Sequence, residues 1–141
     1  MTPLRSDIQW ADTMPPADEA SVCAVEKACH IKFVDEFKEL LGVCDGGIPS
    51  KRRFQTASRK NHEIDTFLSV NSSAPEGRRI VDVYSVVHDE YGSKYVPFAV
   101  DTMGNQICFD SGSRSIFCMN GIAGIVDLVA FNFNMFMESL Y

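Results

Sequence analysis

The fold of this chain is decided by one stretch, Val96-Pro97-Phe98-Ala99-Val100-Asp101, which Thr102-Met103 link to Gly104-Asn105-Gln106-Ile107-Cys108-Phe109-Asp110. Apolar residues dominate both halves, so residues 95–100 and 106–110 are predicted to be strands. Gly104 and Asn105 tolerate the positive φ angles of a tight turn. The stretch therefore predicts an antiparallel hairpin. Pro97 has no N–H to donate, which indicates that its strand begins there or lies at a sheet edge.

Two aspartates flank this hairpin, Asp101 after the first strand and Asp110 after the second. Aspartate side chains at turns accept hydrogen bonds from nearby backbone amides, and this stabilises the turn. We therefore expect a structural role for the hairpin residues rather than direct contact with a partner. The hairpin residues assigned to this structural motif are Pro97, Phe98, Asp101, Gly104, Asn105 and Asp110.

On the C-terminal side of the hairpin, the sequence predicts a further strand and then a helix. Ser111-Gly112-Ser113-Arg114 is typical of a turn, and Ile116-Phe117-Cys118-Met119 is typical of a strand. Three strands joined by short turns form an antiparallel meander. A C-terminal helix is predicted from the apolar positions Ile125, Leu128, Val129, Phe133, Phe136 and Leu140.

Two helices are predicted on the N-terminal side. Asp18 and Glu19 indicate a helix start, because acidic side chains interact favourably with the positive end of the helix dipole. A second helix is predicted from the apolar stripe Phe33, Phe37, Leu40, Leu41 and Cys44. Gly46 and Gly47 are expected to end it, since glycine adopts the left-handed conformation of a helix cap, and Pro49 opposes a restart.

The middle of the chain predicts a strand and a third helix. Alternating residues over 64–70 favour a strand. Ser73 and Glu76 have the spacing of a capping box. Ile80, Val83, Tyr84 and Val87 then recur at helical intervals until Gly92.

Together these elements predict an α+β fold. We expect a single domain over residues 17–141, in which N- and C-terminal helices pack on a mostly antiparallel sheet. Residues 1–16 are predicted to form an extended lead-in, which Ile8 and Trp10 anchor to the body of the domain.

Length and composition agree with one globular domain, at 141 residues with 45% hydrophobic and 23% charged side chains. No apolar run reaches the roughly 18–20 residues that span a bilayer, and the first residues lack the pattern of a secretory signal. The five cysteines (Cys23, Cys29, Cys44, Cys108 and Cys118) form no C-x-x-C pair, which favours free thiols in a reducing compartment. We expect a cytoplasmic protein.

The charge balance bears on the partner. A net charge of −6 disfavours nucleic acid and anionic membranes as partners and suits a basic protein. Residues 51–60 form a basic stretch around Phe54. Because nucleic-acid grooves interleave several stacking aromatics with positive charge, we interpret this stretch as a solvated loop.

No motif indicates an enzyme, and we predict no catalytic residue, metal or cofactor. His88-Asp89-Glu90 is interpreted as the solvated end of a helix. Cys44 is interpreted as a core residue, because the adjacent Asp45 raises the pKa of a thiol and so disfavours the reactive thiolate. A deep pocket that gathers His62 or His88 with carboxylates would instead indicate a catalytic or small-molecule site.

Three segments together resemble the SUKH superfamily, whose eukaryotic relatives include yeast cell-wall assembly regulators. They are Phe37-Lys38-Glu39-Leu40-Leu41 running into Gly46-Gly47-Ile48-Pro49, the hairpin over 96–110, and Phe133-Asn134-Met135-Phe136-Met137-Glu138-Ser139-Leu140. The hairpin is similar to the family pattern PFA-x-D-x-x-GN-x-x-x-x-D, and the last segment to F-x-x-F-x-x-x-L. The resemblance adds Gly46, Gly47 and Pro49 to the structural motif. Two departures are Lys32-Phe33, where Leu-Pro is common, and Asp45, where asparagine is common.

The resemblance implies a bacterial immunity protein that binds and neutralises a cognate polymorphic or contact-dependent toxin, frequently a nuclease. A regulatory or scaffold module of the same fold is the alternative. The implied partner is a toxin domain, not nucleic acid or a membrane. The candidate contacts are exposed acids and aromatics near the sheet edge and its loops: Asp65, Asp82, Asp89, Glu90, Tyr91 and Tyr95.

Overall fold

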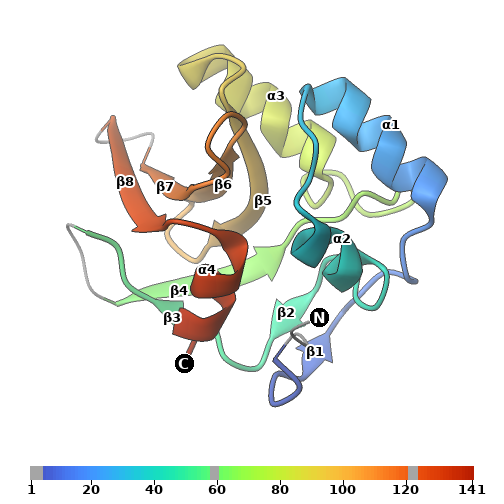
Figure 1. Cartoon of the computed structure of the whole chain (residues 1–141), viewed down its shortest axis with the longest axis horizontal. Helices are drawn as coiled ribbons and strands as arrows, with labels where there is room; N and C mark the ends of the chain where they lie inside the picture. The colour runs from blue at the N-terminus through green and yellow to red at the C-terminus, as the bar shows by residue number, and fades with distance from the viewer. Residues whose placement is uncertain (1–4, 58–60, 121–123) are drawn as a thin grey trace.

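The fold was analysed in a computed structural model, which describes residues 5–57, 61–120 and 124–141 (Figure 1). The elements in chain order are β1 (Trp10–Ala11), α1 (Glu19–Cys29), α2 (Asp35–Leu41), β2 (Ile48–Pro49), β3 (Arg53–Phe54), β4 (His62–Phe67), α3 (Ile80–Tyr91), β5 (Tyr95–Asp101), β6 (Gln106–Asp110), β7 (Ile116–Asn120), β8 (Ile125–Ala130) and α4 (Phe133–Ser139). The predicted α+β class is confirmed.

The main sheet is antiparallel, and its strands follow chain order, β3-β4-β5-β6-β7-β8. The sheet curls, so that β3 and β8, which form its two edges, approach one another (Figure 1). The N–H of Ala57, just after β3, donates to the carbonyl of Leu128 in β8 at 2.9 Å. A short second sheet pairs β1 with β2.

The predicted hairpin is the centre of the main sheet. β5 and β6 pair from Tyr95 opposite Asp110 to Val100 opposite Gln106. Pro97 therefore lies in an interior strand, and the prediction of an edge or a strand start was wrong. The register shifts between Pro97 and Ala99, and an irregularity of this kind accommodates a residue that cannot donate to the ladder.

Both flanking aspartates hold turns through backbone amides, as the sequence predicts. Asp101 Oδ1 accepts from the N–H groups of Met103 at 3.0 Å and of Asn105 at 2.8 Å. Asp110 Oδ1 accepts from the N–H groups of Gly112 at 2.8 Å and of Ser113 at 3.3 Å. Gly104 has a φ of 82°, the left-handed conformation expected of it.

Aromatic rings fill the space between one face of the sheet and the helices α2 and α4. The ring of Phe98, fully buried on β5, lies 4.5 Å from Phe109 and 5.5 Å from Phe136, centroid to centroid. Phe37 on α2 lies 5.3 Å from Phe133 on α4, edge to face. Because Phe98 contacts rings from both the sheet and α4, it joins the two layers of this core.

The helix α3 packs on the sheet beside a smaller apolar cluster, in which Val87 is buried together with Cys108 of β6 and Met119 of β7. The helix α1 lies beside α3 (Figure 1). Its start was predicted correctly: Asp18 is the N-cap and accepts from the N–H of Ser21 at 2.7 Å.

The predicted C-terminal helix is only half right. Residues Ile125–Ala130 form β8, and α4 begins at Phe133 after the N-cap Asn132, whose side chain accepts from the N–H of Met135 at 2.8 Å. Apolar residues at 125, 128 and 129 fit both a helix and an irregular strand, and pairing with β7 decides between them.

Two predicted helix boundaries were also wrong. The helix α2 ends at Leu41 with Gly42 as its C-cap, so Gly46 and Gly47 lie beyond it, in the segment leading to β2. The helix α3 starts after Arg79, so Ser73 and Glu76 form no capping box and lie in the preceding turns.

The lead-in is part of the packed structure over its described residues. Trp10 pairs with Pro49, and its ring meets that of Phe67 edge to face at 5.0 Å. Ile8 is buried in the main core. Arg5 donates to the carbonyl of Met137 at 2.9 Å, which joins the lead-in to α4.

Within the described part of the chain, no helix combines the length and the apolar character that crossing a membrane requires.

Candidate partner-binding surface

Four of the six predicted contact residues come together where α3 ends and β5 begins. Asp89 and Glu90 are exposed in the last turn of α3. Tyr91 and Tyr95 meet edge to face with ring centroids 6.4 Å apart, on either side of the turn at Gly92, whose φ is 81°. We call these four residues, together with their neighbour Val86, the α3-end surface.

Val86 is the residue of this surface that the sequence analysis missed. It is 57% exposed and precedes Asp89 and Glu90 by three and four residues, which places all three on one side of the helix. The signal was present in the sequence, because Val86 falls outside the apolar stripe of Ile80, Val83, Tyr84 and Val87. An apolar side chain flanked by two carboxylates suits a partner with a basic and partly apolar face.

The two tyrosines of the α3-end surface are more enclosed than the sequence suggested. The Tyr91 hydroxyl is buried and has no hydrogen-bond partner within the described residues. Burial raises the pKa of Tyr91, with smaller contributions from Glu90 and Cys108. Tyr95 packs against Phe117 at 5.8 Å, and the Lys94 ammonium lies 5.5 Å from the Tyr95 ring centroid. The two tyrosines are therefore only partly exposed members of the α3-end surface.

The other two predicted contacts lie elsewhere. Asp82, in the first turn of α3, accepts from Arg79 Nε at 2.7 Å and from the N–H of Gly77 at 3.1 Å, and these bonds lower its pKa. Asp65 is exposed on β4, beside Ile64, which pairs with Asp101. Asp101 and Tyr95 are the two ends of β5, about 20 Å apart at the usual rise of a strand.

A buried polar cluster lies where β4, β5 and β7 meet. His62, Asp101 and Cys118 are all buried, and their ligand-type atoms lie within 4.8 Å of one another. Asp101 Oδ2 lies 3.2 Å from His62 Nδ1 and accepts from Asn105 Nδ2 at 2.9 Å. The other oxygen of this carboxylate accepts from two backbone amides, so Asp101 has four nitrogen neighbours at hydrogen-bond distance. We interpret the cluster as a structural network that joins strands. His62 lines neither of the two grooves described below.

The predicted solvated end of α3 is present, because His88, Asp89 and Glu90 are all exposed. His88 packs against Tyr84, with ring centroids 5.7 Å apart.

Three thiols, those of Cys29, Cys44 and Cys108, are made less reactive by burial and not by a neighbouring carboxylate. Desolvation raises the pKa of Cys29 to about 12 and also raises the pKa of Cys44 and Cys108. For Cys44 the direction agrees with the sequence prediction, but the cause is its packing against the core and not Asp45.

Asp45 is itself a buried carboxylate. One of its oxygens accepts from the N–H of Val70 at 3.0 Å, while the other is buried without a partner within the described residues. Desolvation raises its pKa, against the opposing effect of the bonds from Val70, Ser69 and Asn71.

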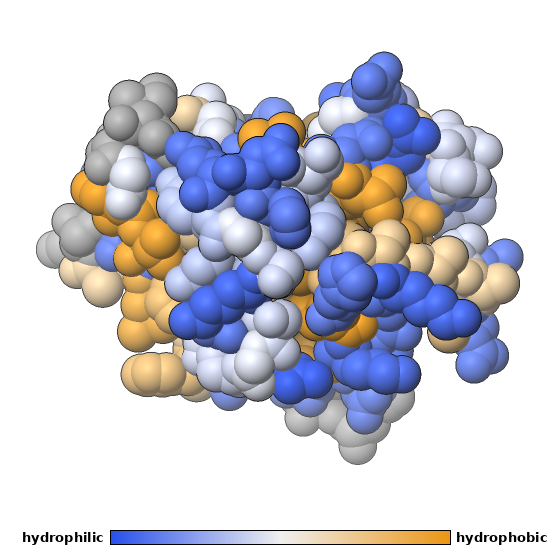
Figure 2. Space-filling model, turned by 90° about the horizontal axis from the view of Figure 1, so that it is seen from above, coloured by the Kyte–Doolittle hydropathy of each residue, from blue (hydrophilic) through white to orange (hydrophobic). Residues whose placement is uncertain are grey.

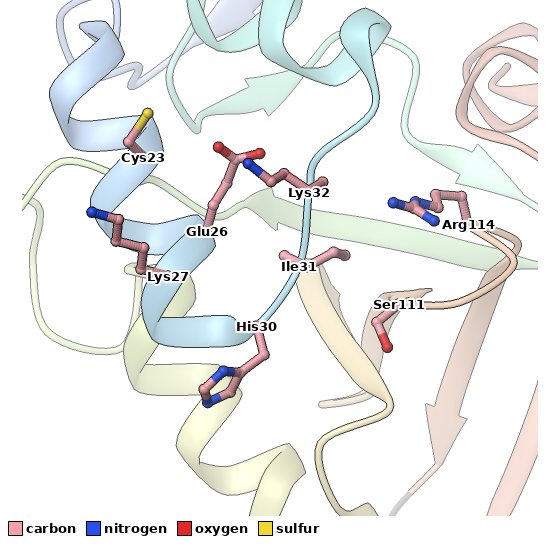
Figure 3. Close-up of a pocket in the computed structure, with 8 residues that line it drawn as sticks. All are labelled: Cys23, Glu26, Lys27, His30, Ile31, Lys32, Ser111 and Arg114. Carbon is pink, nitrogen blue, oxygen red and sulfur yellow. The ribbon is translucent and has the colours of Figure 1, made fainter.

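Grooves open on both ends of α1. One, of about 390 Å³, lies between the start of α1 and residues 69–72. The other, of about 530 Å³, lies between the second half of α1, residues 30–32 and the β6–β7 turn (Figure 3). The residues that line this second groove are Cys23, Glu26, Lys27, His30, Ile31, Lys32, Ser111 and Arg114.

Seen from above, the molecule shows hydrophobic surface gathered on its β8 side, next to more hydrophilic surface in the middle of the view (Figure 2). Ile125 is 47% exposed, Val126 38% and Phe131 66%. The strand β8 thus presents apolar side chains at an edge of the main sheet.

These features define an α+β domain built on a curled antiparallel sheet, with exposed charged surfaces around α1 and α3. A sequence profile of the SMI1/KNR4 family (SUKH-1) matches residues 16–139. The chain belongs to this family. A comparison with curated proteins finds no match.

Proposed function

We propose that this protein is an immunity protein, which binds a cognate toxin domain and neutralises it in the cell that produces it. Membership of the SUKH-1 family carries the proposal, since it supports a role in protein–protein interaction. In this proposal the protein acts by binding alone, without catalysis, metal or cofactor, and in the cytoplasm.

The charge of the molecule supports a basic toxin, with a nuclease as the candidate class. A net charge of −6 attracts a basic partner over a distance and raises the rate of association. Nuclease clefts are basic because they bind phosphates. The α3-end surface offers two exposed carboxylates beside an apolar side chain, and we propose that it covers such a cleft.

The test is co-expression with the toxin-domain protein encoded beside the gene of this chain. Growth rescue and a stable 1:1 complex on co-purification are the expected results. Toxicity without rescue and without a complex would refute the proposal, and would favour a regulatory or scaffold module of the same fold instead.

A further inference from the structure

Unpaired positive charge gathers around the groove of Figure 3. Six of the described lysines and arginines form ion pairs with carboxylates: Arg5, Lys38, Lys51, Arg52, Arg79 and Lys94. Five described cations have no ion pair, namely Lys27, Lys32, Arg53, Arg78 and Arg114. Three of them, Lys27, Lys32 and Arg114, line this one groove. In a chain of net charge −6, such a concentration of free cations at one place marks a site for an anion.

The two central cations come from different parts of the chain. Lys32 belongs to the segment between α1 and α2, and Arg114 to the β6–β7 turn. Figure 3 shows the Arg114 guanidinium pointing toward the segment that carries Lys32. Within the described part of the chain, the guanidinium makes one hydrogen bond, from Nη1 to the carbonyl of Gly112 at 3.0 Å, which leaves most of its donors for a ligand.

The single carboxylate that lines the groove does not cancel this charge. Glu26 is only 8% exposed, and its Oε2 accepts from the N–H of Phe33 at 2.8 Å. Lys38 Nζ, which is not among the residues that line the groove, lies 3.8 Å from the same oxygen. The negative charge of Glu26 is thus balanced by Lys38 and the Phe33 amide, and the side chains that line the groove have a net positive charge.

The backbone fixes both walls in an unusual conformation. His30 and Arg114 have φ angles of 55° and 62°, in the left-handed region that disfavours side chains other than glycine and asparagine. Asp110 holds the turn of Arg114 through the amides of Gly112 and Ser113. His30 is the C-cap of α1, where this conformation is common, so the strained residue of the groove is Arg114.

The groove is open rather than enclosed, because Cys23, Lys27, His30 and Lys32 are all exposed. Pockets for small molecules bury most of the ligand surface, whereas an open groove suits a segment of another protein. Arginine and lysine bind carboxylates through charge-assisted hydrogen bonds. We infer that this groove binds an acidic segment of the protein partner, with Lys32 and Arg114 holding its aspartate or glutamate side chains.

The test uses the ¹⁵N-labelled full chain and an octapeptide of alternating glutamate and glycine. We expect shift changes confined to residues 26–32 and 111–115, and a dissociation constant that rises with salt. Lys32→Glu combined with Arg114→Glu should weaken binding by about tenfold or more. The matched control is Arg53→Glu with Arg78→Glu, which changes the net charge equally at two exposed cations outside the groove and should leave binding nearly unchanged.

Three results would overturn the inference. They are an absence of shifts, equal weakening by the control pair, or the same shifts produced at lower concentration by inorganic phosphate or a single-stranded oligonucleotide. The first two would remove the acidic-segment site, and the third would replace it with a phosphate site.

The inference rests on the proposed function only for the identity of the partner. If the peptide binds in the groove but co-expression gives no rescue and no complex, the immunity proposal fails and the groove remains an acidic-segment site. If the toxin complex forms and the groove variant leaves its affinity unchanged, the groove inference fails and the immunity proposal stands.

Discussion

Gly47 lies where the lead-in crosses the chain so closely that no side chain fits. A Cβ added there would lie 2.6 Å from Thr13 Cγ2 and 2.8 Å from the carbonyl oxygen of Ala11, and φ is +104°. We expect Gly47→Ala to lower the free energy of unfolding by about 2–4 kcal/mol, measured by urea denaturation. Gly104→Ala is the control, because its φ of +82° is strained but nothing lies within 4 Å, and it should lower stability by about 1 kcal/mol. Equal losses for the two variants would show that crowding at Gly47 is unimportant.

Because the Asp45 carboxylate is buried, we expect that replacing it with a neutral side chain increases stability, and that the increase depends on pH. Its pKa is raised in the folded state, so the folded protein binds this proton more tightly than the unfolded chain does. Stability from this group is full below the ordinary aspartate range and is lost as pH rises through the raised pKa. Asp45→Asn should therefore raise the free energy of unfolding by about 1 kcal/mol at pH 7, and by nearly nothing near pH 4. A loss at pH 7, or an equal gain at both pH values, would contradict this.

Single residues were predictable where the cause is local. Asp101 and Asp110 were correctly expected to bond to the amides of their own turns, since the partners lie within four residues. Gly47 was singled out for the wrong reason, because its constraint is contact with Thr13, far away in the sequence. The Asp45 environment also depends on a distant residue, Val70.

Among the elements, β5 supplies the central side chain of the aromatic core, Phe98. Substitution of Phe98 therefore tests how much this core contributes to stability. Phe98 is fully buried, whereas Phe131, after β8, is 66% exposed. We expect Phe98→Ala to lower the free energy of unfolding by about 3–5 kcal/mol, from lost apolar contact and an unfilled cavity. Phe131→Ala deletes the same atoms from the surface and should change stability by less than about 0.5 kcal/mol in chemical denaturation. A small loss for Phe98→Ala would mean that α4 can move in to fill the space.

Elements with a clear local sequence pattern were predicted correctly, whereas elements whose conformation depends on pairing with a neighbouring strand were not. The helix α1 was predicted from its acidic start, α3 from apolar residues at helical spacing, and β6 and β7 from apolar runs between turns. The strand β8 was taken for helix because its apolar pattern fits both, and its partner β7 settles the matter. The prediction that Pro97 begins its strand or lies at a sheet edge was wrong for a similar reason. The register shift that accommodates this proline depends on both β5 and β6.

At the scale of the whole molecule, the domain carries two surfaces of opposite charge. The α3-end surface is acidic, and the groove beside Lys32 and Arg114 is basic. The sequence analysis predicted six contact residues as one set, and the structure brings together the four that are close in the chain, Asp89, Glu90, Tyr91 and Tyr95. The groove was missed, since it joins residues 23–32 to residues 111–114, which only the tertiary fold brings together.

Under the proposed function, the α3-end surface predicts how the complex with a toxin domain responds to a change of charge. Asp89→Lys with Glu90→Lys should weaken the complex by more than about 1 kcal/mol, and should reduce the salt dependence of the association rate measured by surface plasmon resonance. Glu39→Lys with Glu76→Lys is the control, with the same change in net charge away from the α3-end surface. If both pairs slow association equally, overall charge and not this surface directs the encounter; if neither affects binding, the α3-end surface lies outside the interface.

The position of α4 also has a consequence for how the protein is made. Phe133 and Phe136 complete the aromatic core, and Tyr141 exchanges two backbone hydrogen bonds with Arg53 at the β3 edge, each of 3.1 Å. While a ribosome is still translating the chain, the rings of β4, β5 and β6 have no cover from α4. Folding into the native state must therefore wait until α4 has left the exit tunnel, so a nascent chain cannot complete its aromatic core before its synthesis has passed that helix.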